Sequence, residues 1–251
     1  MGSAMKRSLG WTVVAMLCFG QSLLAQTQEP SLQLSLSGDG AGQLSLPLRI
    51  LLFLTFLVFI PAILVSMTAF VRIIVVMHFL RQALGTNQAP NNQILVGLSL
   101  FLTFFVMSPV WDRVYQDAVV PYQQQAVDEW EALSRAEGPL REFMLRQVRE
   151  QDLALFVRVS RIPRPTNPGE IPLRVLVPAF MISELRTAFN IGFALFLPFL
   201  VIDMVISAVL LSMGMLQLPP VMISTPFKVL LFILVDGWNL IVGSLVESFR
   251  M

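Results

Sequence analysis

The sequence predicts an all-α fold of two long, kinked helical hairpins with a small amphipathic helical insertion between them. Hydrophobic residues make up 55% of the 251 residues and charged residues only 13%, about half the ~25% that is usual in soluble domains. Four apolar segments have nearly the length that a bilayer requires, and a charged stretch separates the first two from the last two. This pattern indicates an integral membrane protein or a subunit buried in a larger apolar assembly.

Residues 1–25 are typical of a signal peptide. Lys6 and Arg7 precede an apolar stretch too short to span a bilayer, and cleavage is expected after the small residue Ala25. An uncleaved anchor is the alternative. Residues 26–47 are polar and rich in Gly and Ser, which predicts a flexible segment on the exported side. Cys18 is the one cysteine, so cleavage would leave no thiol for disulfides, catalysis or metal binding.

The first hairpin is predicted over residues 48–110 and the second over residues 178–251. Short links join the apolar segments of each, "RQALGTNQAPNNQ" in the first and "GMLQLPP" in the second. Links this short force neighbouring helices to run antiparallel. Pro61, Pro198 and Pro226 fall inside apolar segments, and we expect the helices to break there.

The insertion, residues 111–177, holds nine Arg and ten acidic residues. It predicts one helix over residues 122–136 and a second that begins at Pro139, with a favourable i,i+4 pair between Glu142 and Arg146. Because the signal peptide exports the N-terminus, the insertion is expected on the exported side of the membrane and both short links on the inner side.

Charged residues inside the apolar segments are the candidate contact sites. Glu184 and Arg186 lie about 200° apart around a helix, so neither can neutralise the other. An unpaired buried charge costs several kcal/mol, so each is expected to contact a group on another helix, of another subunit. A monomeric bundle that supplies both partners is the alternative. The leading candidates are Asp203, Lys228 and Asp236. The full set of expected inter-subunit contacts is Glu184, Arg186, Asp203, Lys228, Asp236 and Arg72. Three acids against three bases favour pairing over a proton relay.

Signatures of enzymes, metal sites and cofactor sites are missing from the sequence. It has a single histidine, His78, and no HExxH, CxxC, P-loop or GxGxxG pattern. We therefore expect no catalytic residue, no metal and no cofactor, and we read His78 as an interfacial residue. The net charge of +1 gives no reason to expect nucleic acid as a partner.

Three stretches are specific enough to indicate a family. They are "VPAFMISELRTAFNIGFALFLPFLVIDMVISAVLLSMGMLQLPP", "TPFKVLLFILVDGWNLIVGSL" and "RQALGTNQAPNNQILVGLSLFLTFFVMSP". They closely resemble the FliP/SctR family of type III secretion export-gate proteins, over roughly residues 48–250. The signal peptide fits the flagellar branch, with the injectisome branch as the alternative. From the residues alone, an ion-coupled transporter that uses the buried carboxylates is a further alternative.

The resemblance implies an assembly and a location. FliP-like chains form a homopentamer that joins FliQ and FliR in a tapering, ring-like helical export gate, alongside the export proteins FlhB and FlhA. The gate conducts unfolded flagellar proteins across the bacterial inner membrane at the flagellar basal body. In this family the hairpins stack above the bilayer plane, so apolar segments need not cross lipid.

The resemblance also implies a pore constriction in the loop before Pro219. The family has a Met-rich gasket there, and the corresponding residues are Met213, Gly214, Met215, Leu216 and Gln217. Leu216 and Gln217 depart from the Met expected at these positions. The alternative is an ordinary turn between helices, ended by Gly214.

Overall fold

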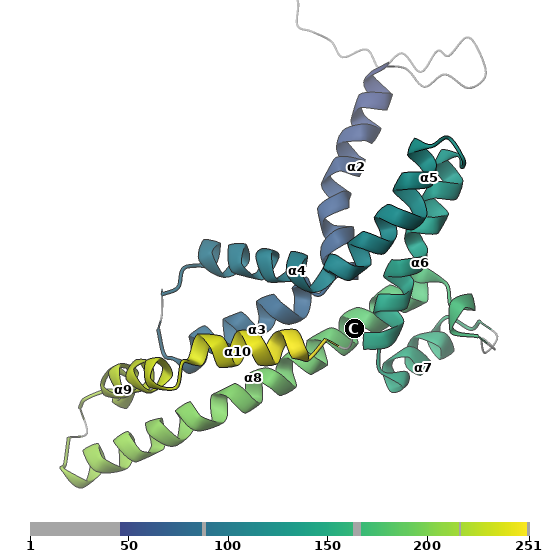
Figure 1. Cartoon of the computed structure of the whole chain (residues 1–251). Helices are drawn as coiled ribbons and strands as arrows, with labels where there is room; N and C mark the ends of the chain where they lie inside the picture. The colour runs from purple at the N-terminus through teal and green to yellow at the C-terminus, as the bar shows by residue number, and fades with distance from the viewer. Residues whose placement is uncertain (1–45, 87–88, 163–166, 216, 250–251) are drawn as a thin grey trace, which may run out of the picture. The chain divides into compact units, whose positions relative to one another are not determined.

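The computed structural model describes residues 46–249 apart from 87–88, 163–166 and 216 (Figure 1). Within these ranges every regular element is helical and no strand occurs, which confirms the prediction of an all-α fold. The predicted signal peptide, residues 1–25, lies outside the described residues, as does nearly all of the predicted flexible segment.

The chain divides into two compact units, residues 1–57 and 58–251. Helix α2 (Leu46–Met67) crosses the boundary and contains Pro61. Its side chains are apolar on all sides and mostly exposed, including Ile50, Phe53 and Val58. A helix that is hydrophobic all round is typical of a membrane span or a protein-covered core.

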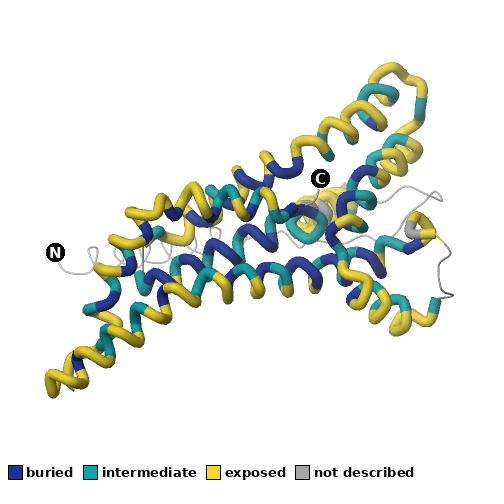
Figure 2. Tube along the Cα trace, turned by 60° about the horizontal axis from the view of Figure 1, so that its bottom comes forward, coloured by how far each residue is buried: buried dark blue, intermediate teal, exposed yellow. Residues whose placement is uncertain are grey.

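The core of the second unit is built on α3 (Phe70–Ala83), which packs against α4 (Asn92–Val114) and α8 (Leu173–Ser212). Ile73, Val76 and Leu80 recur at helical spacing on α3 and are buried. Figure 2 shows that the buried residues follow the facing sides of these helices. The α3–α8 contact therefore holds together segments separated by about a hundred residues.

The insertion continues directly from α4. A π-helical turn (Tyr115–Val119) and α5 (Val120–Gln123) extend α4, and α6 (Glu129–Gln147), α7 (Glu150–Val159) and a 3-10 turn (Pro168–Glu170) follow. Asp128 caps α6 by accepting a hydrogen bond from the Glu131 amide at 2.7 Å. The predicted helix over residues 122–136 is therefore wrong at both ends. A single helix starts after Asp128 and runs through Pro139, where we expected a new one to begin.

The last apolar segment forms two helices, α9 (Pro220–Leu234) and α10 (Gly237–Glu247), bent by 68°. The break falls at Asp236, which adopts the left-handed conformation with φ 50°. The bend brings the backbone of Gly237 against Phe232, so closely that a Cβ would lie 2.3 Å from its ring.

The expectation that prolines break the helices is wrong. Pro61, Pro198 and Pro226 all lie inside helices α2, α8 and α9. The breaks fall instead between α2 and α3 and between α9 and α10. A proline removes one backbone hydrogen bond, and a long helix with packed or apolar surroundings tolerates that loss.

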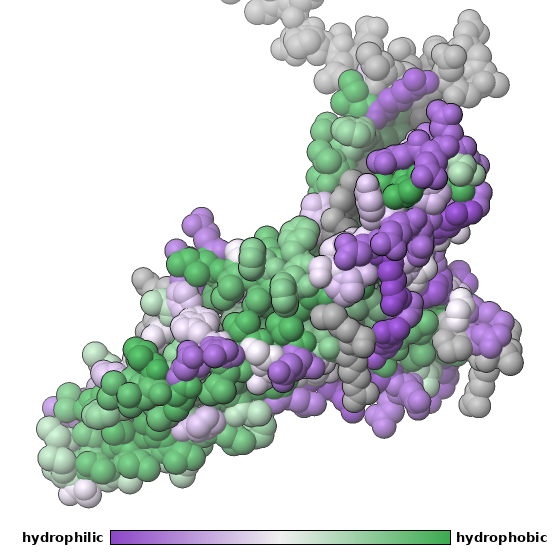
Figure 3. Space-filling model, in the orientation of Figure 1, coloured by the Kyte–Doolittle hydropathy of each residue, from purple (hydrophilic) through white to green (hydrophobic). Residues whose placement is uncertain are grey.

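In the part of the chain that the structure describes, three helices are long and apolar enough to cross a membrane: Pro47–Met67, Asn92–Gln123 and Leu173–Ser212. The bent pair α9 and α10 provides a fourth if both helices form one span. Within the second unit, Figure 3 shows apolar surface over α8 and α9 and polar surface over α5, α6 and α7. The polar surface thus coincides with the insertion.

Candidate functional site

Arg72 of α3 is the centre of the most deeply buried charged cluster. Its Nε donates to Oε2 of Glu184 at 2.9 Å, and its Nη2 donates to the other carboxylate oxygen. The two side chains are 2% and 0% exposed. This is the two-pronged geometry in which a guanidinium binds a carboxylate most strongly.

The remaining donors of Arg72 reach two further elements. Nη1 donates to the carbonyl oxygen of Ser248 at 2.9 Å and to its hydroxyl at 3.1 Å, and Nη2 donates to the side-chain carbonyl of Gln147 at 3.2 Å. The guanidinium also lies 3.9 Å from the centroid of the Phe249 ring. All five N–H groups therefore have acceptors, and α3, α6, α8 and the segment after α10 meet at one side chain.

Asp203 and Lys228 form a second cluster, between α8 and α9. The Lys228 ammonium donates to one carboxylate oxygen of Asp203 at 2.6 Å, and the Ser224 hydroxyl donates to the other at 2.6 Å. Lys228 is 3% exposed and Asp203 is 33% exposed. Gly85 of the α3–α4 turn approaches this cluster, since a Cβ there would lie 3.9 Å from the ammonium.

Arg186 lies on the other side of α8 from Glu184, as the helical geometry predicts. Its guanidinium is about half exposed and lies 3.9 Å from a carboxylate oxygen of Asp152. Asp152 is buried and already accepts a hydrogen bond from the Ser183 hydroxyl at 2.8 Å. Asp236, at the bend between α9 and α10, is exposed and has no side-chain partner among the described residues.

The structure thus sorts the six predicted contact residues within one chain. Glu184 pairs with Arg72, and Lys228 pairs with Asp203 rather than with Glu184. Sequence reasoning missed Gln147, Ser248 and Asp152, and nothing in their local sequence distinguishes them from other polar residues. The structure holds a single chain, so contacts of the six residues with other subunits stay a prediction.

His78 lies beside the α3–α4 turn. Its Nδ1 is 3.2 Å from Nη2 of Arg81, and Arg81 Nη1 donates to the side chain of Asn92 at 2.6 Å. Burial, and then the positive charge of Arg81, lower the pKa of His78 below its usual range. The imidazole is therefore neutral at neutral pH and accepts a hydrogen bond from Arg81, whose other Nη binds Asn92 at the start of α4.

The loop between α8 and α9 contains the predicted constriction residues. Gly214 has φ +73°, its amide donates to Leu211, and the Met215 amide donates to Leu210. This is the Schellman arrangement that ends a helix at a left-handed glycine. Met213 and Met215 are 66% and 43% exposed, Gln217 is also exposed, and Leu216 lies outside the described residues. The pore-lining role of these five residues stays a prediction.

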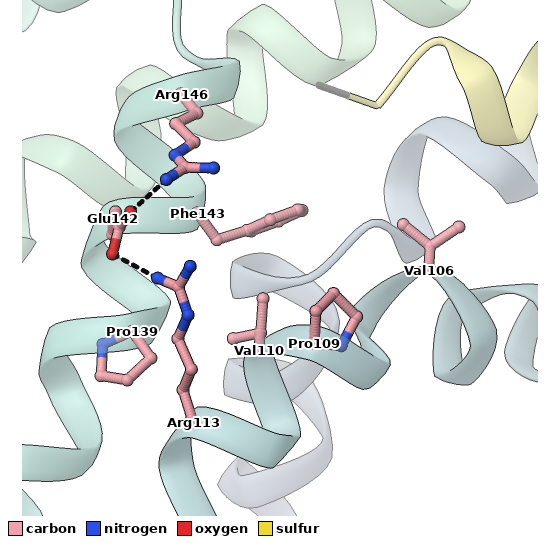
Figure 4. A pocket seen from close by; sticks show the side chains of 8 residues that line it. All are labelled: Val106, Pro109, Val110, Arg113, Pro139, Glu142, Phe143 and Arg146. Atoms are coloured by element: carbon pink, nitrogen blue, oxygen red, sulfur yellow. Dashed lines mark hydrogen bonds and ion pairs between the residues drawn. The ribbon is translucent and has the colours of Figure 1, made fainter. Parts of the chain in front are cut away.

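A small surface pocket of about 60 Å³ lies between α4 and α6. Glu142 bridges two arginines there, accepting from Arg113 at 2.7 Å and from Arg146 one turn along α6 (Figure 4). The predicted Glu142–Arg146 pair is confirmed. All three side chains are about half exposed, so the cluster is a surface feature that joins the insertion to the end of α4.

Long apolar helices locked together by buried ion pairs define a class: helical proteins that work in or against a membrane. The family model described as the FliP family matches residues 53–245, and the chain belongs to that family. It is 54% identical over 211 residues to the flagellar biosynthetic protein FliP of Pectobacterium carotovorum subsp. carotovorum, covering 84% of this chain and 82% of that protein. It is 51% identical over 213 residues to the protein of the same name from Bacillus subtilis (strain 168), covering 85% and 96%. The family resemblance of the sequence motifs is thereby confirmed.

Proposed function

We propose that this chain is a pore-forming structural subunit of the flagellar type III protein export gate. In this role it conducts unfolded flagellar proteins across the inner membrane and catalyses no reaction. Membership of the FliP family, whose relatives above are called flagellar biosynthetic proteins, carries the proposal. Those printed names favour the flagellar branch over the injectisome branch.

The surface of α8 supports a role inside an assembly. The helix has 40 residues, so at 1.5 Å per residue it is about 60 Å long, twice the ~30 Å hydrocarbon core of a bilayer. The exposed surface of α8 is largely apolar and includes Phe193, Val201 and Met204. Arg186, which is about half exposed, is a charged residue within that surface. Lipid alone suits neither the length nor the charge, whereas neighbouring protein subunits suit both.

The assembly we propose is a homopentamer that joins FliQ and FliR and contacts FlhB and FlhA. It lies in the inner membrane at the flagellar basal body, with the N-terminus and the insertion on the periplasmic side. The transporter alternative has less support, because Glu184 and Asp203 each face a cation that neutralises them. Paired carboxylates are poor carriers of protons or ions.

The α8–α9 loop is the proposed constriction. Gly214 ends α8 sharply and leaves Met213 and Met215 exposed in a short uncharged loop. Several copies around an axis would bring these flexible side chains together, and an apolar ring blocks water and ions by dewetting. The same rotamer freedom would let an unfolded chain push the ring apart.

The decisive experiment complements a strain that lacks its own family member and measures flagellar protein secretion and membrane conductance. We expect wild type to restore secretion without ion leakage. Replacing Met215 and Leu216 with Ala should keep the oligomer intact in native mass spectrometry but make the membrane leak. Met222→Ala, at an exposed methionine of α9, is the matched control and should stay tight. A wild-type chain that assembles but restores no secretion would refute the proposed function.

A further inference from the structure

Arg186 on α8 and Asp236 at the bend between α9 and α10 are charges of opposite sign on exposed apolar surface. Arg72 and Glu184 saturate one another, and Lys228 neutralises Asp203. Arg186 makes one long ion pair, at 3.9 Å with Asp152, and Asp236 has no side-chain partner within the described ranges.

Arg186 projects from an apolar stripe. Ile182, Phe189 and Phe193 lie at helical spacing on the same side of α8 and are 41%, 53% and 67% exposed. Asp152, the nearest carboxylate, is at the outer limit of an ion pair at 3.9 Å and already binds Ser183. The Arg186 guanidinium is therefore about half exposed and keeps donors that no group among the described residues accepts.

Asp236 projects from a second apolar surface. Ile233, Leu234 and Leu240 surround it in sequence and are 67%, 73% and 58% exposed. Its left-handed backbone, at φ 50° and ψ 53°, is one that few residues other than Gly, Asn and Asp adopt readily. The bend thus carries an unpaired carboxylate among exposed apolar side chains. A helix that faces water would have polar side chains there.

We infer that Arg186 of one copy forms an ion pair with Asp236 of a neighbouring copy of this chain. The pair would lie between the apolar stripe of α8 in one copy and the apolar bend of α9 and α10 in the next. Because the two faces differ, the contact is head-to-tail and propagates into a ring or helix of copies. The inference rests on the proposed function only in requiring that copies of the chain assemble.

A second copy fits this surface better than lipid does. An anionic headgroup would bind Arg186 but would repel Asp236, and lipid tails offer neither charge a partner. Each contact between two copies satisfies one Arg186 and one Asp236, and a neighbour on each side of a copy covers both of its apolar faces. It also makes the order of copies directional, since each copy offers one cation and accepts one.

Cysteine cross-linking between two differently tagged copies tests this contact. Arg186→Cys is placed in one copy and Asp236→Cys in the other, both in a Cys18→Ser background within the intact chain. Oxidation in membranes should give a dimer that carries both tags, and either single variant alone should give none. Leu211→Cys paired with Asp236→Cys is the control, since Leu211 is 61% exposed on the same helix but 25 residues from Arg186.

Neutralising variants give an independent measurement. Arg186→Gln and Asp236→Asn should each lower the yield of purified oligomer about tenfold, and the double variant should lower it no further, because each change removes the same pair. Asn adopts the left-handed backbone of position 236 readily, so the loss does not come from a strained bend.

Three results would overturn the inference: no mixed dimer from an assembled oligomer, a cross-link to a different protein, or a double variant whose loss is the product of the two single losses. None of these outcomes bears on secretion. If the mixed dimer forms but the complemented strain secretes nothing, the contact stands and the proposed function fails.

Discussion

Arg72–Glu184 and Lys228–Asp203 are both ion pairs between helices of apolar sequence, yet their surroundings differ. In the first pair both partners are almost fully buried and the cation contacts three elements besides its own helix. In the second pair the lysine is buried but a third of the aspartate is exposed. The first pair is closed within its own chain, whereas the second presents its carboxylate at a surface.

This difference separates two roles for charged residues in apolar helices. One pair stabilises the fold of a single chain, and the other offers a carboxylate at the surface. The Arg72 guanidinium has no donor left for a neighbour, so we expect Arg72 and Glu184 to stabilise the fold of one chain. The open side of Asp203 can still accept from water or from another protein. We therefore expect the two pairs to respond differently when one partner is removed.

Glu184→Ala should have the largest effect on stability. It leaves the Arg72 guanidinium buried without its counter-ion, which costs about 3–5 kcal/mol in comparable buried pairs. Denaturant unfolding of the purified protein in detergent measures the loss. Arg72→Lys should be intermediate, because lysine keeps the charge but not the five planar donors.

The double variant Arg72→Met, Glu184→Leu controls for the burial itself. Replacing both charges removes the desolvation cost and should leave the protein closer to wild type than Glu184→Ala. A Glu184→Ala protein as stable as wild type would show that the cluster does not hold the fold.

The second pair should respond asymmetrically. Asp203→Asn leaves the Lys228 ammonium 3% exposed and without a counter-ion, at a cost of about 2–3 kcal/mol. Lys228→Met should cost less, because water can hydrate the partly exposed carboxylate that remains. Unfolding of the two variants side by side checks the asymmetry. Equal losses would mean that both pairs are closed and that the contrast between them is wrong.

Gly192 lies on α8 between the two pairs and tests the α3–α8 contact that joins them. A Cβ at this position would lie 2.5 Å from the Phe79 ring, so Gly192→Ala should destabilise the protein by about 1–2 kcal/mol through overpacking. Thermal unfolding is the measurement. Gly243→Ala is the matched control, since nothing lies within 4 Å of that position, and it should be neutral or stabilising.

The smallest effect is expected for the surface cluster of the insertion. Arg113 and Glu142 are 51% and 46% exposed, so Arg113→Ala should cost at most about 1 kcal/mol. Because salt screens exposed charges, the difference from wild type should shrink at high ionic strength. A large loss of stability that does not depend on salt would show that this pair contributes as much as a buried ion pair.

Helix periodicity predicted well what depends on near neighbours. It placed Glu184 and Arg186 on opposite sides of one helix, and it found the Glu142–Arg146 pair. The start of α6 was also readable, because Asp128 followed by Glu131 has the spacing of a helix cap.

What depends on distant parts of the chain could not be predicted in the same way. Arg72 meets Glu184 across 112 residues, and no local pattern selects that partner over Lys228. The bend at Asp236 depends on how closely the backbone of Gly237 can approach Phe232, which is a packing property. Composition predicted that charges would pair, and only the three-dimensional arrangement decided which.

The reach of Arg72 has a consequence for the order in which the protein is made. Ser248, which accepts from Nη1, is synthesised 176 residues after Arg72. At about 5–20 residues per second, translation takes roughly 10–35 s to supply it. During that interval a charged side chain on an apolar helix lacks part of its final coordination. Until translation reaches Ser248, water, lipid headgroups or an insertion factor must therefore solvate the Arg72 guanidinium.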